Sequence, residues 1–164
     1  MFRFPNPVNE LSARLVAGGV AGLAIAILVT RWEWLLVVLT YGFVARVLTG
    51  PRLSPLALVV TRSVTPRLPV APKLVPGPPK RFAQGIGATL STAAVVAAFG
   101  FDQPGLAWLL VAAILVAATL ESVFATCVGC ILFSMLMRLG VIPEAVCREC
   151  ADLTRRVPQT TATR

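Results

Sequence analysis

Four long apolar stretches divide the chain, and polar residues gather between them. The stretches cover about residues 11–31, 34–48, 82–101 and 106–137. Because a transmembrane helix needs about 20 mainly apolar residues, each stretch predicts one span. The fourth stretch is longer than one crossing requires, so we expect it to tilt or to project beyond the bilayer. The pattern therefore predicts an all-α integral membrane bundle of four transmembrane helices.

The segment between the second and third stretches, residues 49–81, is basic and rich in proline. Ser54 followed by Pro55 is typical of a helix start, with serine as the cap and proline in the first turn. We predict a short helix from there to about Pro66, lying on or dipping into the membrane interface. Prolines recur after it, so residues 68–79 are expected to be extended and polyproline-like.

Charged residues indicate the orientation of the bundle. Basic residues of loop 49–81 and of the C-terminal part are Arg52, Arg62, Arg67, Lys73, Lys80, Arg81, Arg138, Arg148, Arg155, Arg156 and Arg164. The two other connections are short and hold only Arg31 with Glu33, and Asp102. Since lysine and arginine collect on the cytoplasmic side of a membrane, we predict that loop 49–81 and both termini face the cytoplasm.

The domain organisation follows from the same pattern. A break at Gly140 to Pro143 ends the fourth stretch, and we predict a short cytoplasmic helix after it. We expect one membrane domain over residues 1–150 and a polar tail over 151–164. The first stretch is long for the apolar part of a signal peptide and no small-residue cleavage site follows it, so we expect it to stay as a span.

Composition supports the membrane interpretation and narrows the chemistry. The 164 residues are 57% hydrophobic and 13% charged, with a mean hydropathy of +0.82, whereas about a quarter of a soluble domain is charged. The absence of histidine excludes Ser-His-Asp and Cys-His catalysis. The net charge is +8, but the basic residues lie between the apolar runs. A nucleic-acid-binding protein would instead carry a basic face on a folded domain, so we expect no nucleic-acid partner. The expected partner is the lipid bilayer, with anionic lipid at the basic loop.

Two ionisable residues fall inside the predicted spans. Glu121 lies about 22 Å of helix beyond Leu106, and Arg46 lies about 16 Å beyond Leu35 on the antiparallel second span. An unpaired charge at such depth costs several kcal/mol, so we predict a structural ion pair between Arg46 and Glu121. On a helical wheel Glu121 is about half a turn from Cys130, so we do not expect the carboxylate to serve the thiols.

Four cysteines form two CxxC pairs, Cys127–Cys130 and Cys147–Cys150, separated by sixteen residues. Residues three apart on a helix share a face, so Cys127 and Cys130 should present their sulfurs together. The first pair lies about 31 Å of helix beyond Leu106, which puts it at the inner edge of the bilayer. The helix break before the second pair lets the chain fold back, so all four thiols can meet at the cytoplasmic interface.

Three roles for these cysteines remain open. Tetrahedral zinc or an iron–sulfur cluster would use all four thiolates, those of Cys127, Cys130, Cys147 and Cys150. A dithiol relay would use one pair to attack and the other to resolve, since CxxC geometry lowers a thiol pKa. In the third role the membrane pair is buried as small apolar side chains. Permanent disulfides are not expected in a reducing cytoplasm.

Four motifs in order carry a family resemblance: GPRLSP at Gly50–Pro55, GPPKRFAQ at Gly77–Gln84, CVGC at Cys127–Cys130 and CREC at Cys147–Cys150. With them the chain resembles a bacterial membrane family known only as domain of unknown function 4395. The resemblance covers about residues 5–150. It implies a small multi-span protein of the bacterial cytoplasmic (inner) membrane, with both cysteine pairs as family features and thioredoxin-like or sulfurtransferase proteins as candidate partners. It transfers no activity and no catalytic residue.

The functional hypothesis is a thiol-based redox or sulfur relay at the cytoplasmic membrane face. In it, Cys127 and Cys130 form the membrane-edge pair, and Cys147 and Cys150 form the exposed pair that meets a soluble partner. The alternative is a non-enzymatic membrane subunit whose four cysteines hold a structural zinc ion or iron–sulfur cluster. The sequence determines neither the cofactor nor the substrate.

Overall fold

The computed structural model describes residues 7–67, 73–143 and 146–147. Its main elements are α1 (Glu10–Thr30), α2 (Trp34–Thr49), α4 (Gly77–Val95), extended by a π-helical turn over Val96–Gly100, and α5 (Pro104–Phe124). Within the described residues, four helical segments that contain these elements are long and apolar enough to cross a membrane. The predicted all-α class is confirmed, as is the presence of four helices that are long and apolar enough to span a membrane.

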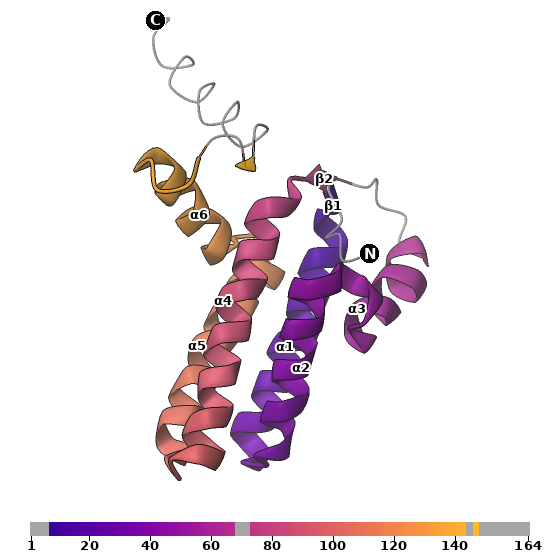
Figure 1. The fold of residues 1–164 in the computed structure, drawn as a ribbon. Coiled ribbons are helices and arrows are strands. Elements are labelled where there is room, and N and C mark those ends of the chain that lie inside the picture. The colour runs from indigo at the N-terminus through magenta and orange to yellow at the C-terminus, as the bar shows by residue number, and fades with distance from the viewer. Residues whose placement is uncertain (1–6, 68–72, 144–145, 148–164) are drawn as a thin grey trace, which may run out of the picture.

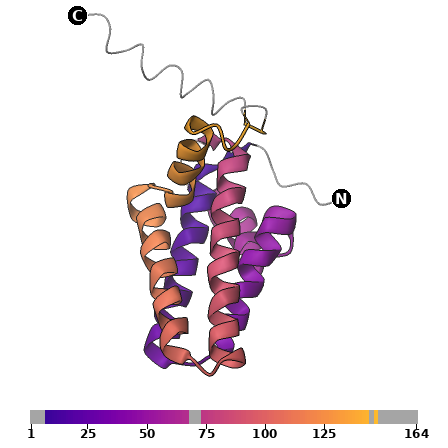
Figure 2. The ribbon, with the colours of Figure 1, turned by 60° about the vertical axis from the view of Figure 1, so that its left-hand side comes forward.

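The four long helices form a ring in which sequence neighbours are not the closest partners. Helix α1 packs mainly against α5 and α2 against α4, while α4 also lies beside α5 (Figures 1 and 2). Short connections close one end of the bundle, where Arg31 and Asp102 take left-handed backbone conformations. The smaller elements gather at the opposite end, near the start of α1 (Figure 1).

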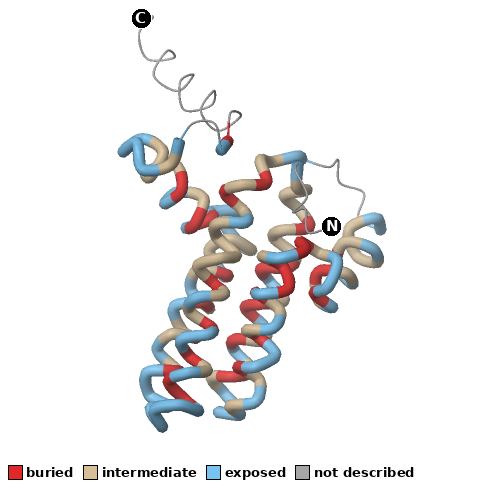
Figure 3. Tube along the Cα trace, viewed as in Figure 1, coloured by how far each residue is buried: buried red, intermediate tan, exposed pale blue. Residues whose placement is uncertain are grey.

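Alanines pack between larger apolar side chains such as Ile27, Leu36 and Leu39 in the interior of the ring, and further large apolar side chains cover its outside. Buried core residues include the alanines Ala17, Ala21, Ala24, Ala94, Ala97, Ala98, Ala107 and Ala118. The outer faces carry exposed Val29, Tyr41, Leu109, Val116 and other large apolar side chains, so exposed and buried positions alternate along each helix (Figure 3). Close packing of small residues with apolar side chains facing outward is how helices associate in lipid.

The ring of Phe43 on α2 packs directly against Gly87 of α4. A Cβ atom at this position would lie 2.2 Å from the ring of Phe43, so only glycine allows this separation. Gly22 on α1, by contrast, is exposed, and a Cβ there would meet nothing within 4 Å. Of the small residues that favour close approach, Gly87 therefore makes an intramolecular contact and Gly22 does not.

The predicted interfacial segment is helical. It consists of α3 (Pro55–Val59), a π-helical turn over Val60–Val64 and a 3-10 turn over Thr65–Arg67. Val16 of α1 packs against Ala57 and Val60 of this segment. Pro55 occupies the first turn as predicted, but the hydroxyl of Ser54 does not cap the helix. It accepts a hydrogen bond from Arg46 Nη1 at 3.2 Å instead.

The proline-rich prediction is only partly right. Residues 68–72 lie outside the described part of the chain, and β2 (Leu74–Val75) is extended and pairs antiparallel with β1 (Val8–Asn9). Helix α4 then begins at Gly77, so Pro78 and Pro79 are helical rather than polyproline-like. The reason is that proline is well tolerated in the first turn of a helix, where its missing N–H group is not needed.

The fourth apolar stretch is two helices rather than one tilted span. Helix α5 ends at Phe124, Ala125 takes a left-handed conformation (φ 56°), and α6 (Val128–Arg138) begins after Cys127. Arg14 of α1 donates hydrogen bonds to the carbonyls of Ser122 and Val123, which lack partners within their own helix. The predicted helix after Pro143 falls largely outside the described residues.

Candidate functional site

The first cysteine pair sits at the start of α6. Cys127 is the N-cap residue, with extended backbone (φ −90°, ψ 104°), and its carbonyl accepts hydrogen bonds from the N–H groups of Cys130 and Ile131. The two thiols also hydrogen-bond to each other. The prediction that these sulfurs lie together is confirmed, although Cys127 precedes the helix instead of lying inside a span. A thiol at a helix N-terminus is favoured as thiolate by the helix dipole.

Gly129 fixes α6 against α4. A Cβ atom at residue 129 would lie 2.5 Å from both Cα and Cβ of Ala83, so the two backbones touch at this point. One turn further along, the ring of Phe133 packs edge-on against that of Phe82, with 5.6 Å between centroids. These contacts hold the CVGC motif beside the first turns of α4.

The first turns of α4 bring a cation to the thiols. Lys80 forms a buried ion pair with Glu121 of α5, with Nζ 2.5 Å from Oε1, and both side chains are less than 15% exposed. Both charges act electrostatically on Cys127. The helical wheel separated Glu121 from the thiols because it assumed one continuous helix, whereas the break at Ala125 turns the chain back, so that the Glu121 carboxylate is close enough to act on Cys127.

The two thiols have opposite acidities. The hydrogen bond from Cys130 lowers the pKa of Cys127 below that of an ordinary cysteine, and the positive charge of Lys80 acts in the same direction. Burial and the Glu121 carboxylate oppose this effect. The same thiol–thiol hydrogen bond raises the pKa of Cys130 well above its ordinary value. Cys127 is therefore the thiol of the pair that ionises more readily, with Cys130 as its hydrogen-bond donor.

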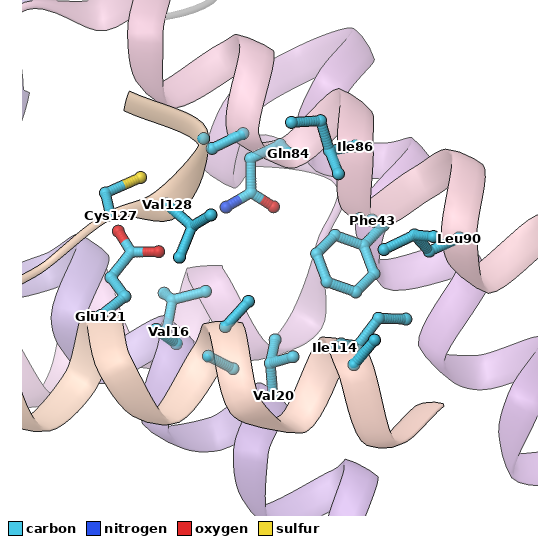
Figure 4. A pocket seen from close by; sticks show the side chains of 17 residues that line it. Val16, Val20, Phe43, Gln84, Ile86, Leu90, Ile114, Glu121, Cys127 and Val128 are labelled. Carbon is cyan, nitrogen blue, oxygen red and sulfur yellow. The ribbon is translucent and has the colours of Figure 1, made fainter. Parts of the chain in front are cut away.

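Two hollows meet at Cys127. One is a groove of about 490 Å³ lined by Cys127, Cys130, Lys80 and other residues of α4 and α6. The other is a mainly apolar cavity of about 240 Å³ inside the bundle. Figure 4 shows this cavity with the Glu121 carboxylate and the Cys127 thiol close together at one end and Phe43 toward the other. Cys127 therefore lines both the groove and the cavity inside the bundle.

Arg46 does not form the predicted ion pair. Its side chain is buried, with the whole residue 5% exposed, but Nε donates to Gln84 Oε1 at 2.8 Å and Nη1 donates to Ser54. Among the described residues, the carboxylate of Glu121 makes its salt bridge with Lys80 instead. The sequence pattern predicts a loop at Lys80, yet α4 begins at Gly77 and brings Lys80, not Arg46, into contact with Glu121. Pro78 and Pro79 are the sequence signal for the start of α4 just before Lys80, because proline is favoured in the first turn of a helix.

The second cysteine pair is described only in part. Cys150 lies outside the described residues, as do Arg148 and Glu149. Cys147 is 5% exposed and disulfide-bonded, contrary both to the expectation of an exposed thiol and to the expectation that the cysteines form no permanent disulfide. Within residues 7–67, 73–143 and 146–147, no three cysteine, aspartate or glutamate side chains are grouped to hold a metal ion.

Fold and site together define the class: an all-α multi-pass membrane protein with a CxxC motif at the N-terminus of a short helix beside a buried lysine–glutamate pair. Residues 8–138 match the model of a family described as "Domain of unknown function (DUF4395)". The chain belongs to this family, as the resemblance of its motifs implied. Comparisons with curated proteins and with solved structures gave no match.

Proposed function

We propose that this protein is a thiol-based redox or sulfur relay that works through Cys127 and Cys130. The observation that carries the proposal is the arrangement of the pair: hydrogen-bonded thiols at a helix N-terminus, beside the cation of Lys80, on the wall of a groove. A low-pKa thiol with a resolving neighbour is the requirement for thiol–disulfide exchange.

The reaction needs a disulfide as oxidant, supplied by a partner. The Cys127 thiolate attacks one sulfur of that disulfide, forming a mixed disulfide and releasing the partner's other sulfur as thiolate. Cys130 then loses its proton and attacks Cys127, which releases the second partner thiolate. The products are a Cys127–Cys130 disulfide and a dithiol partner, so two electrons pass to the partner. In the sulfur branch, a persulfide donor transfers its outer sulfur to Cys127 and leaves as a thiolate.

The groove indicates what kind of partner fits. Lys73, Lys80 and Arg138 line it together with Glu10. Lys73 pairs with Glu10 and Lys80 with Glu121, so the positive charge that Arg138 adds favours a partner with an acidic contact surface. A thioredoxin-like or sulfurtransferase protein remains the proposed partner class. The role of Cys147 and Cys150 as the second pair of the relay belongs to the same proposal.

Trapping tests the assignment of the two thiols. We expect Cys130→Ser, treated with glutathione disulfide, to accumulate a mixed disulfide at Cys127, because the resolving thiol is gone. The matched variant Cys127→Ser should react more slowly: it loses the hydrogen bond with Cys127 that raises the pKa of Cys130 most, but burial still raises the pKa of this remaining thiol. Site-resolved peptide mass spectrometry measures both. A Cys130→Ser protein without adduct at residue 127, or equal rates in the two variants, would contradict the proposal.

The proposed orientation places the thiol end in the cytoplasm of a bacterium, in its cytoplasmic membrane. Basic residues gather at the end of the bundle that carries α3 and α6: Arg14, Arg52, Arg62, Arg67, Lys73, Lys80, Arg81 and Arg138. The opposite end holds Arg31 with the acids Glu33 and Asp102. This is the asymmetry of the positive-inside rule.

Labelling with a membrane-impermeant maleimide tests this orientation. Arg62→Cys should be modified only after the membrane is permeabilised, whereas Asp102→Cys should be modified in intact cells. Both positions are exposed, so accessibility of the side chain itself does not differ. The reverse labelling pattern would put the thiols outside the cytoplasm.

A further inference from the structure

A third hollow, of about 350 Å³, lies on the α3 side of the bundle and is separate from the interior cavity shown in Figure 4. It is bounded by the start of α1, the end of α2, α3 and the first turns of α4. Its polar lining includes Arg46, Lys80, Gln84, Ser12 and Thr61, and the rest is largely apolar. None of the described residues that line it is acidic.

The charges around this pocket do not balance. Among the described residues, the buried Arg46 and the largely buried Lys80 lie near Glu121, whose carboxylate already makes a salt bridge with Lys80, and the Glu10 carboxylate pairs with Lys73. Arg46 has only neutral partners for Nε and Nη1, and within the described part of the chain its buried Nη2 has no hydrogen-bond acceptor. The Glu121 carboxylate attracts this guanidinium, but its salt bridge is with Lys80. A buried guanidinium without a counter-charge in direct contact is strongly unfavourable.

A bound anion would supply the missing charge. We propose that the pocket beside Arg46 and Lys80 binds one phosphate-type anionic group. Arginine with a neighbouring lysine is a favourable combination for phosphate oxygens, since the guanidinium offers several directed donors and the ammonium adds a point charge. The apolar part of the lining, including Val16 and Ala57, fits the adjoining body of an amphiphile. The phosphate can therefore be that of an anionic lipid or free in solution.

Ligand-induced stabilisation tests this site in the full-length chain. The delipidated protein in uncharged detergent is titrated with short-chain phosphatidylglycerol, with diacylglycerol of the same chains, and with inorganic phosphate, and the thermal unfolding midpoint is followed. We expect a saturable rise with at least one phosphate compound and none with diacylglycerol. A response to phosphatidylglycerol alone identifies a lipid, and a response to inorganic phosphate identifies a soluble anion.

Variants separate the pocket from general surface charge. Arg46→Gln should weaken the apparent affinity about tenfold or more, the loss expected for one charge-assisted hydrogen bond. Arg62→Gln removes the same charge from an exposed position of the basic segment and should bind like the wild type. Ala13→Leu fills the pocket without removing a charge and should also lose binding, which decides the matter if Arg46→Gln does not fold.

Three results would overturn the proposal. One is the absence of stabilisation by both phosphate compounds. Another is an equal loss of affinity in Arg62→Gln and Arg46→Gln, which would show that the attraction is spread over the basic surface. The third is wild-type affinity in a folded Ala13→Leu protein. None of these depends on the thiol chemistry, so the pocket and the relay can fail separately.

Discussion

Replacing Lys80 by methionine should destabilise the bundle by about 3–5 kcal/mol, because it leaves the Glu121 carboxylate buried without its partner. The side chains of the pair are 12% and 13% exposed, so water does little to compensate the remaining charge. The free energy of unfolding in mixed micelles measures the effect. The double variant Lys80→Met, Glu121→Leu should recover much of the loss, since it removes both charges.

Lys73→Met is the matched control for this prediction. Lys73 pairs with Glu10 at 2.8 Å, but its side chain is 76% exposed. Surface ion pairs contribute about 0–1 kcal/mol, so this variant should be close to the wild type. If Lys80→Met costs no more than Lys73→Met, the Lys80–Glu121 pair does not stabilise the protein as its burial indicates.

Alanine at Gly129 should displace α6 from α4 and reduce the reactivity of Cys127. The added Cβ would lie 2.5 Å from the backbone Cα of Ala83, which cannot move aside as a flexible side chain can. Overpacking of this kind costs about 1–3 kcal/mol. Because α6 carries the thiol pair, its displacement should also weaken the contact of Cys127 with Lys80. The rate of Cys127 alkylation at neutral pH should then fall.

Gly85→Ala provides the comparison for Gly129→Ala. Gly85 lies on α4 two residues from Ala83, and a Cβ there would meet nothing within 4 Å. Alanine is the better helix former by up to about 1 kcal/mol, so this variant should be neutral or slightly more stable, with unchanged thiol reactivity. Equal behaviour of the two alanine variants would mean that the α4–α6 contact does not position the thiols.

Hydropathy was sufficient to predict the four spans, because lipid demands a run of apolar residues whatever the neighbouring helices are. The exact helix ends were less predictable. The end of α5 at Phe124 has no glycine or proline signal: Ala125 takes a left-handed conformation, and Arg14, more than 100 residues away in sequence, binds the last carbonyls. A tertiary contact of this kind cannot be read from local sequence.

The candidate site was predictable in its thiols but not in its charges. CxxC spacing alone brings Cys127 and Cys130 together, whether the first residue is inside the helix or caps it. Glu121 pairs with Lys80 because α4 begins at Gly77 and so includes Lys80. The pattern of apolar residues does not show where α4 begins, so it could not predict this ion pair. Arg46 was correctly recognised as an ionisable residue buried in a span, but its partners Gln84 and Ser54 are neutral and therefore leave no charge pattern in the sequence.

The pH dependence of Cys127 alkylation tests the central claim most directly. It is measured on the reduced full-length protein, with peptide-level mass spectrometry to resolve the cysteines and with zinc and iron determined on the same sample. The account predicts a midpoint below the pKa of free cysteine, about 8.5, and an upward shift in Cys130→Ala, where the stabilising hydrogen bond is lost. A midpoint at or above that of free cysteine, or stoichiometric metal with an unreactive Cys127, would contradict the relay.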